Sequence, residues 1–262
     1  MKRIILLVLF LMAAQECRAD EHRIISLAPN ATEILFELGL AGAVVGVDEY
    51  SNYPQGAKDI ERVGTFDKPN IERIILLRPD YILVNTDMEG DKADYLKGLG
   101  ARIIKVSPKT VEGLCNSITG LGAMFNREAR AGLIVKKIRG AVRKASLNTG
   151  RPRPKVFVQL HNDPLVTVSS FIGDVIRISG GDNIAWDVKD EAALFSYEVM
   201  LQRNPDIMII IGFSKEWDLP DSISAVRKGR IFKDLDPDIF LRPGPRVTEA
   251  IEQLNRIFYE ES

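Results

Sequence analysis

One segment of this chain occurs twice, and it constrains the fold more than any other feature. The segments 72–85 and 198–212 each open with Glu, continue as an amphipathic helical pattern, pass through Pro-Asp and end in an apolar run. The residue before proline is disfavoured in the helical region, so each helix should stop there, and the apolar run that follows is typical of a buried parallel strand. Two copies of such a unit predict two similar α/β lobes.

The repetition places two carboxylates, Glu72 and Glu198, at matching points on these lobes. The helix dipole also favours an acidic residue in a first helical turn, and for either Glu alone that structural explanation is sufficient. Their recurrence at equivalent positions favours a functional role for the pair.

Apolar runs alternate with helical patterns along the whole chain, which is typical of parallel α/β layers. In the first lobe the predicted strands are 23–28, 44–47, 81–84 and 102–106, and the predicted helices are about 30–40, 70–78 and 91–99. In the second lobe the predicted strands are 155–160, 165–168, 207–211 and 230–232, and the predicted helices are about 171–179, 196–203 and 245–259.

A long helical pattern without strand signals separates the two lobes. We therefore predict an N-terminal α/β lobe over 20–122, a linking helix over 123–150 and a C-terminal α/β lobe over 151–262. A helix of about 20 residues is about 30 Å long, which is enough to connect two lobes. A single stiff connection of this kind predicts limited hinge opening.

The start of the chain has the pattern of a targeting segment. Two basic residues precede the apolar run 4–14, which is too short to span a bilayer, and the segment 17–19 supplies small residues at the positions that a signal peptidase reads. We expect 1–19 to be a cleavable signal peptide and the rest of the chain to be exported to the periplasm. The residues before Cys17 do not fit a lipoprotein signal, so lipid anchoring is the minor alternative.

Charge and cysteine content exclude several classes of protein. The formal net charge is -1, and removal of residues 1–19, which contain three basic residues and one acidic residue, changes it to about -3. This is not the balance of a nucleic-acid-binding protein. After cleavage Cys115 is the only cysteine, so no intramolecular disulfide can form, and hydrophobic cores must hold the domains together.

Enzyme chemistry and a bare metal-ion site have little support. The sequence has no Gly-x-Ser-x-Gly motif, no phosphate-binding Gly-x-x-x-x-Gly-Lys loop and no dinucleotide fingerprint after the first strand. His22 and His161 are the only histidines, too few for an imidazole-rich zinc site. We expect no catalytic residues and no catalytic metal, and a two-lobed hydrolase is the least favoured alternative.

An ordered series of motifs resembles one protein family. The series consists of Arg23-Ile-Ile-Ser-Leu-Ala-Pro-Asn-Ala-Thr-Glu33, Gly46-Val-Asp-Glu-Tyr50-Ser-Asn-Tyr-Pro54, Val63-Gly-Thr-Phe66, the two Glu segments, Ser179-Gly-Gly-Asp-Asn-Ile184 and Arg242-Pro-Gly-Pro-Arg246. It is similar to the helical-backbone substrate-binding proteins of ABC importers, the class III periplasmic binding proteins, and most similar to members that bind cobalamin. The resemblance covers essentially the whole chain after residue 19.

The resemblance implies an α/β fold of two Rossmann-like lobes with parallel sheets, joined by one long α-helix, with a ligand cleft between the lobes. It implies a monomer that binds a corrinoid and delivers it to a membrane permease dimer with its ATPase subunits. It assigns Glu72 and Glu198 to docking on that permease, one Glu to each permease subunit. Relatives on the same scaffold bind ferric siderophores or haem, and these ligands are the alternative.

The loops after the parallel strands are where a ligand should bind in the first lobe. Pro29 and Asn30 lie in the first such loop, and Asn30-Ala-Thr-Glu33 also has the pattern of a helix N-cap with Glu at the third helical position. Tyr50 and Phe66 lie in later loops, and their rings are candidate walls against a flat macrocycle.

In the second lobe the resemblance places Asp238 at the ligand as a polar contact, with Phe240 and Arg242 in the same loop. We expect Arg246 to brace that loop. The chain departs from the cobalamin-binding members at Ala192 and Val166, where an aromatic residue is expected, and at Phe66, where they have tryptophan.

The alternative ligands have weaker sequence support. A haem binder usually offers Tyr or His to the iron, and Tyr50, Tyr53, His161 and Tyr197 are possible axial ligands, although no pair is fixed by spacing. A catecholate binder needs several cations, whereas Arg242 and Arg246 form only a thin basic cluster. A corrinoid is therefore the leading hypothesis, and a ferric chelate or haem is the second.

Overall fold

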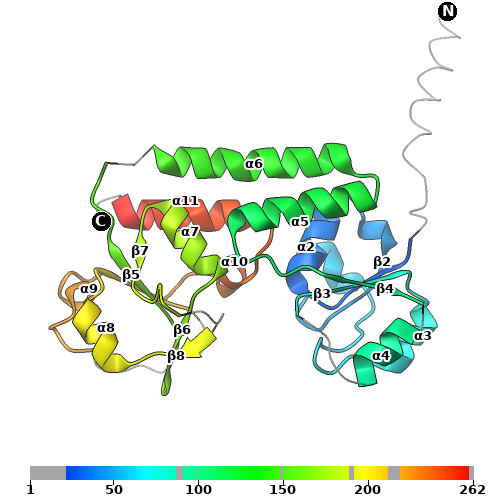
Figure 1. Cartoon of the computed structure of the whole chain (residues 1–262), viewed down its shortest axis with the longest axis horizontal. Coiled ribbons are helices and arrows are strands. Elements are labelled where there is room, and N and C mark those ends of the chain that lie inside the picture. The colour runs from blue at the N-terminus through cyan, green and yellow to red at the C-terminus, as the bar shows by residue number, and fades with distance from the viewer. Residues whose placement is uncertain are drawn as a thin grey trace, which may run out of the picture. The chain divides into compact units, whose positions relative to one another are not determined.

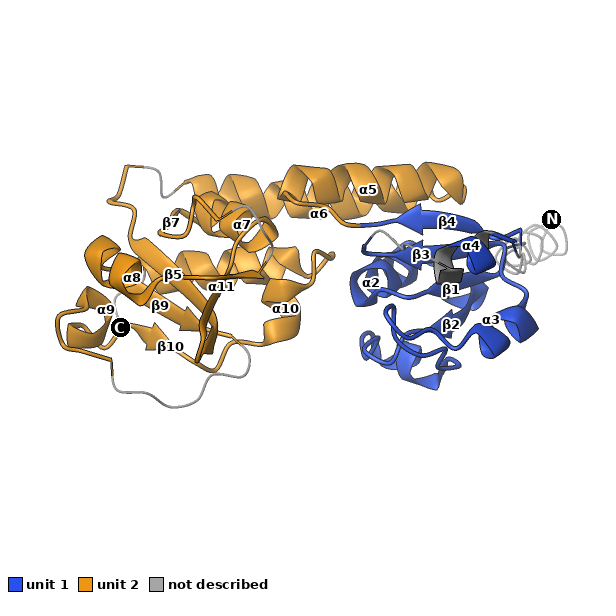
Figure 2. Ribbon diagram, turned by 60° about the horizontal axis from the view of Figure 1, so that its bottom comes forward, with its two compact units in different colours: residues 1–106 blue, residues 107–262 orange. Residues whose placement is uncertain are grey.

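The computed structural model describes residues 22–86, 91–98, 100–147, 150–188, 192–211 and 219–259. The chain divides into two compact units, Met1–Val106 and Ser107–Ser262 (Figure 1 and Figure 2). The expected signal peptide at 1–19, with Cys17, lies outside the described residues. No helix in the described ranges is both long enough and apolar enough to cross a membrane.

Unit 1 is built on a parallel sheet with the strand order β2-β1-β3-β4. The strands are β1 (Ile24–Ser26), β2 (Val44–Val47), β3 (Tyr81–Val84) and β4 (Arg102–Lys105). The helices are α2 (Pro29–Glu37), α3 (Ile71–Leu77) and α4 (Asp91–Gly98), with short 3-10 helices η2 (Ala41–Ala43) and η3 (Gln55–Asp59). The predictions for β2 and β3 are confirmed to the residue, and those for the other elements are confirmed within a few residues.

Helices cover both faces of this sheet. Successive side chains of a strand point to opposite faces, so neighbouring residues of β1 contact different helices. Ile25 and Ile82, which are partners on neighbouring strands, pack in one buried cluster with Ile74 of α3 and Leu96 of α4. The next residue of β1, Ser26, instead contacts Thr32 of α2. Unit 1 is therefore a helix-sheet-helix sandwich, and its strands end at one shared edge.

The repeated segment forms the same structure in both units. It forms α3 in unit 1 and α8 (Tyr197–Arg203) in unit 2, and each helix begins after a polar side chain that accepts the N–H three residues on. Each helix ends at a residue in the left-handed region directly before proline, Arg78 with φ 44° and Asn204 with φ 48°. The predicted stop before Pro-Asp is confirmed in both copies.

The aspartate of each copy bonds to the chain at the start of an interior strand of its own sheet. Asp80 Oδ2 accepts the backbone N–H of Arg23 at 2.7 Å, and Asp206 Oδ2 accepts that of Lys155 at 3.1 Å. In return, the side chains of Arg23 and Lys155 donate to the carbonyl of the last residue of α3 and α8, at 2.7 Å and 3.3 Å. The Pro-Asp repeat therefore joins each short helix to the first strand of its own unit.

Unit 2 contains a mixed sheet with the strand order β10-β9-β5-β6-β8, in which β7 also pairs with β5. The strands are β5 (Lys155–Asn162), β6 (Leu165–Val168), β7 (Asp182–Asn183), β8 (Ala192–Leu194), β9 (Ile207–Ile210) and β10 (Ile231–Phe232). β6 runs antiparallel to β5 and to β8, so the second sheet is mixed, whereas the sequence predicted parallel sheets in both lobes. Only the two residues 163–164 separate β5 from β6, and so short a connection can join antiparallel strands but not parallel ones.

The remaining helices of unit 2 are α5 (Val111–Met124), α6 (Glu128–Ser146), α7 (Phe171–Ser179), α9 (Ser224–Arg227), α10 (Pro237–Leu241) and α11 (Val247–Tyr259). The long helix predicted over 123–150 is α6, and it follows α5. Inside unit 2, α6 packs on α5, α7 and α11, and α5 also packs on α7 (Figure 1). The first unit consequently ends at Val106, before the predicted lobe end at 122. On the other face of the sheet, Phe157 and Met208 pack with Met200 of α8 and Ala225 of α9.

Candidate functional site

Two neighbouring loops of unit 1 carry exposed aromatic side chains. Tyr50 and Tyr53, which follow β2, have 61% and 41% of their surface exposed, and Phe66 in the next loop has 41% exposed. The backbone N–H of Glu49 donates to the carbonyl of Gly64 at 3.0 Å and joins the two loops. The three rings therefore lie on adjoining loops at the carboxyl edge of the sheet, where parallel sheets bind their ligands.

A buried polar network supports the Tyr50 loop. The hydroxyl of Thr32 contacts those of Ser26 and Ser51 at 2.8 Å and 2.7 Å, and all three residues are fully buried. The Asp48 carboxylate accepts the hydroxyl of Ser51 and, at 3.3 Å, the backbone N–H of Tyr50. Because buried polar groups are costly unless hydrogen-bonded, this network fixes one conformation of the loop and leaves the ring of Tyr50 in solvent.

The neighbouring loop depends on a glycine. Gly64 has φ +85°, and a Cβ added there would lie 2.4 Å from the carbonyl oxygen of Lys68. The guanidinium of Arg62, at the start of this loop, donates to the carbonyls of Asp48 and Ser51 at 2.7 Å and 2.9 Å. The position of Phe66 relative to Tyr50 is therefore set by backbone geometry and by hydrogen bonds.

The predicted capping role of Asn30 is wrong. α2 begins at Pro29, and its N-cap is Ala28. Proline suits the first helical position because that residue needs no N–H donor, so Asn30 lies inside the first turn. Its side chain is buried and donates to the carbonyl of Val106 at 3.0 Å, which ties α2 to the chain just after β4. Pro29 is half-buried at the same edge.

In unit 2 the predicted polar contacts form two ion pairs around α10. Asp236 caps the helix by accepting the N–H of Asp238 at 2.9 Å. Asp238 pairs with Arg242 at 2.8 Å, and Asp236 pairs with Arg246 at 3.8 Å. Arg246 thus braces the start of the loop, as predicted. Each arginine is balanced by a carboxylate, so the thin basic cluster carries no net charge.

Phe240 does not have the position that the sequence predicted. Its side chain is 1% exposed and ranks among the largest fully buried side chains of the protein. α10 packs on α7 and α11, and this packing turns Phe240 into the core. The prediction of a ligand contact at Phe240 is therefore wrong in this structure. The side chain of Asp238 is 33% exposed and that of Arg242 is 14% exposed, so both can still reach a ligand.

The other residues considered for metal binding are engaged locally. The Nδ1 atom of His161 accepts the backbone N–H of Asp163 at 3.2 Å in the turn after β5. Tyr197 packs against the cluster that contains Phe157 and Met200. Within the described residues, no group of three or more His, Cys, Asp or Glu side chains could hold a metal ion.

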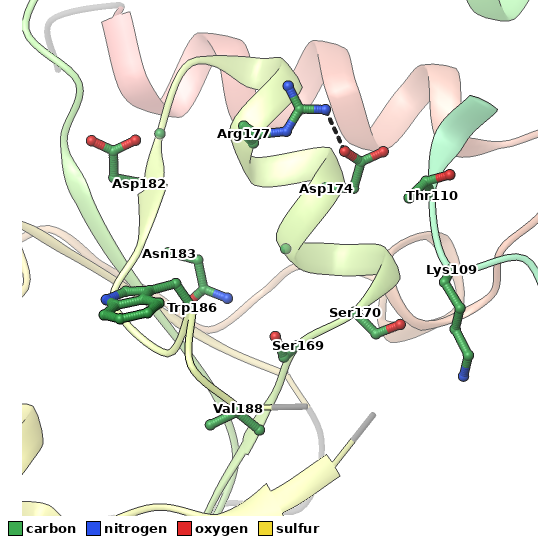
Figure 3. A pocket seen from close by; sticks show the side chains of 12 residues that line it. Lys109, Thr110, Ser169, Ser170, Asp174, Arg177, Asp182, Asn183, Trp186 and Val188 are labelled. Carbon is green, nitrogen blue, oxygen red and sulfur yellow. Dashed lines mark hydrogen bonds and ion pairs between the residues drawn. The ribbon is translucent and has the colours of Figure 1, made fainter. Parts of the chain in front are cut away.

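Sequence reasoning missed Trp186, which lines a cavity of about 800 Å³ beside α7 (Figure 3). The indole is 76% exposed, and the guanidinium of Arg203 lies 5.7 Å from its centre. Asp182 and Asn183, which also line the cavity, pair with the start of β5. The cavity is therefore not at the carboxyl ends of the parallel strands. No spacing rule distinguishes an exposed tryptophan in a turn from a buried one.

Glu72 and Glu198 occupy equivalent exposed positions, each as the second residue of its helix. The hydroxyl of Ser196 donates to Glu198 Oε2 at 2.6 Å, and this bond holds the pKa of Glu198 below its ordinary value. The structure thus confirms that the repeat places two carboxylates on the surface, one on each unit.

Comparisons with known proteins agree with this architecture. A family model described as periplasmic binding protein matches residues 24–236. The vitamin B12-binding protein of Yersinia pestis is 29% identical over 240 residues, covering 89% of this chain and 85% of the relative. An uncharacterised ABC transporter substrate-binding lipoprotein of Bacillus subtilis is 28% identical over 261 residues, covering 94% and 82%.

Solved structures with different ligands share the fold. The periplasmic vitamin B12-binding protein of Vibrio cholerae has a TM-score of 0.79 and 28% identity, covering 90% of this chain and 96% of that one. A possible iron-binding protein of Staphylococcus epidermidis has a TM-score of 0.78 and 29% identity, covering 91% and 99%. A periplasmic haem-binding protein has a TM-score of 0.77 at 22% identity, covering 90% and 97%, which is a likeness of fold alone.

Proposed function

Because the chain belongs to the periplasmic binding protein family, whose members are substrate-binding proteins of ABC importers and not enzymes, we propose that it binds a corrinoid of the cobalamin class for import. The observation that carries this proposal is the aromatic surface of unit 1, formed by Tyr50, Tyr53 and Phe66. These aromatic rings are exposed on loops that buried hydrogen bonds hold in one conformation. They therefore offer a large contact area to a flat macrocycle without much loss of side-chain entropy.

The charges in unit 2 support a ligand without strong net charge. Asp238 and Arg242 neutralise each other, and so do Asp236 and Arg246. A ferric catecholate carries several negative charges and would require unbalanced cations, whereas the amide side chains of a corrinoid can donate to a carboxylate and accept from a guanidinium. The proposed contacts are therefore Pro29, Tyr50 and Phe66 in unit 1 and Asp238 and Arg242 in unit 2. Asn30 supports this site from its buried position.

Haem is the second candidate, and one observation favours it. Tyr50 and Tyr53 are both exposed in one loop, and a tyrosine phenolate is a known ligand of haem iron. Calorimetric titration with cobalamin, cobinamide, haem and a panel of ferric siderophores separates the candidates. The proposal predicts a one-to-one complex with cobalamin or cobinamide. Saturable binding of haem or of a siderophore, with none of either corrinoid, would replace it.

We further propose that Glu72 and Glu198 dock the protein on its permease. Both carboxylates are exposed at equivalent helix starts, so each can meet an arginine on one subunit of a two-fold permease dimer. Exposed charges of this kind orient docking and contribute little to fold stability. Glu72→Ala combined with Glu198→Ala should therefore reduce transport and permease binding, while ligand affinity and melting temperature stay nearly unchanged.

The matched control is Glu37→Ala combined with Glu249→Ala, which also removes one exposed carboxylate from each unit. Added salt should weaken docking of the wild type more than docking of the Glu72/Glu198 variant, because screened charges contribute less. Wild-type transport by the Glu72/Glu198 variant, with the permease present, would return both residues to the helix-dipole explanation.

A further inference from the structure

The outward face of α6 is strongly basic in a chain that is nearly neutral. This helix carries six Lys or Arg residues and a single acidic residue, Glu128, whereas the whole chain has a net charge of -1. All six cations are exposed. Cation side chains in a last helical turn are favoured by the helix dipole, but this effect covers only Arg143 and Lys144.

Only two of the six cations have an ion-pair partner among the described residues. Arg139 pairs with Glu112 at 2.6 Å, and Lys144 pairs with Glu252 at 3.6 Å. In the part of the chain that the structure describes, Arg130, Lys136, Lys137 and Arg143 make no ion pair or side-chain hydrogen bond. A solvated helix usually alternates the two signs of charge so that pairs form along its surface, and α6 does not.

Two large apolar side chains lie among these cations. Leu133 is 68% exposed, and Leu147, directly after the last turn, is 82% exposed. The helical period of 3.6 residues places five exposed residues on the side of α6 opposite its buried residues. These five are Leu133, Lys136, Lys137, Arg143 and Leu147, and the buried residues form a stripe along the helix. The buried residues of that stripe are Ala131, Ile134, Val135, Ile138, Ala141 and Ala145.

We propose that this surface, which we call the α6 face and define as Arg130, Leu133, Lys136, Lys137, Arg143 and Leu147, binds the surface of an anionic phospholipid bilayer. Unpaired cations match the negative headgroups, and exposed leucines can enter the boundary between headgroups and acyl chains. The opposite side of α6 is packed on α5, α7 and α11, so the α6 face is formed before it meets a membrane and needs no folding step. Such binding would retain the protein near the membrane independently of its ligand and its permease.

The test is flotation of the protein with phospholipid vesicles. The chain is purified from the cell envelope in its exported form and mixed with vesicles of phosphatidylcholine alone or with an equal amount of phosphatidylglycerol. The proposal predicts binding to the anionic vesicles that falls steeply with added salt. Lys136→Gln, Lys137→Gln and Arg143→Gln together should lower the partition coefficient by about fivefold per cation, on the order of a hundredfold in all. Leu133→Ala with Leu147→Ala should lower it further.

The matched control is Lys58→Gln, Arg102→Gln and Lys233→Gln, which removes the same charge from exposed positions elsewhere. The proposal predicts that this control binds like the wild type, and circular dichroism should show both triple variants folded. Three results would overturn it: no binding of the wild type to anionic vesicles, equal binding to both vesicle types, or equal losses in the two triple variants. Specific capture of an acidic protein without vesicle binding would also overturn it.

Discussion

Replacement of Tyr50 by alanine examines the aromatic surface of unit 1 quantitatively. A Tyr side chain that becomes buried covers roughly 200 Å². Because 61% of Tyr50 is exposed, about 120 Å² of its surface is accessible to solvent. A flat ligand on one face of the ring would cover about half of this accessible surface, about 60 Å². At about 25 cal/mol per Å², Tyr50→Ala should weaken binding by about 1.5 kcal/mol, or about tenfold in Kd.

Isothermal titration with cyanocobalamin measures this loss directly. The melting temperature of Tyr50→Ala should equal that of the wild type, because the exposed ring contributes little to core packing. The supporting network of Ser26, Thr32 and Ser51 is also unchanged. Tyr50→Phe should bind a corrinoid almost as the wild type does, because only the hydroxyl is lost.

The matched control is Tyr95→Ala, which removes a ring that is 50% exposed on α4 of the same unit. It should leave the titration unchanged. Equal affinities of Tyr50→Ala and the wild type would refute the placement of the ligand on this surface. In a parallel titration with haem, a large loss of affinity with Tyr50→Phe would instead indicate a phenolate ligand to iron and would favour haem.

Three further substitutions test the supporting structure. Asp206→Ala should reduce the free energy of unfolding by about 1 to 3 kcal/mol in urea titrations, because the carboxylate accepts three hydrogen bonds, one of them from the N–H of Lys155. Partial burial raises the pKa of Asp206, but the three hydrogen-bond donors outweigh this effect and lower the pKa overall. The stabilisation by Asp206 should therefore be present above the unfolded-state pKa and be lost as pH falls through the folded-state pKa. A stability difference between the wild type and Asp206→Ala that does not change with pH would contradict this. Gly64→Ala should weaken ligand binding and lower the melting temperature, since its Cβ would meet the Lys68 carbonyl, and wild-type behaviour would exclude that strain. Phe240→Ala should cost about 3 to 5 kcal/mol of stability through the cavity it leaves, and a loss of affinity alone would restore Phe240 as a ligand contact.

The sequence predicts the parallel core of each unit well because those strands are continuous apolar runs. Val44–Val47 and Tyr81–Val84 are confirmed to the residue, and the repeated Pro-Asp marks the helix stops in both units. What the pattern could not give is strand direction. β6 is an apolar run like the others, and the signal for its antiparallel direction was the short connection to β5, which the prediction did not use.

The sequence predicts the candidate site correctly where side chains are exposed in loops. It fails where tertiary packing decides whether a side chain is exposed or buried. Tyr50 and Phe66 are exposed as expected, whereas Phe240, which the sequence also placed in a loop, lies in α10 and is buried where that helix packs on α7 and α11. The Pro before Asn30 was the signal that the cap prediction overlooked. Trp186 could be found only from the structure, because its exposure depends on the turn after β7.

The central claim is that the ligand is a corrinoid, and the visible absorbance of the protein after exposure to competing chromophores tests it most directly. The protein is incubated with equimolar cobalamin and haem, separated from free ligand by gel filtration and scanned. The account predicts one equivalent of cobalamin absorbance in the protein peak and no Soret band of bound haem. A protein peak that carries haem, or neither chromophore, would contradict it.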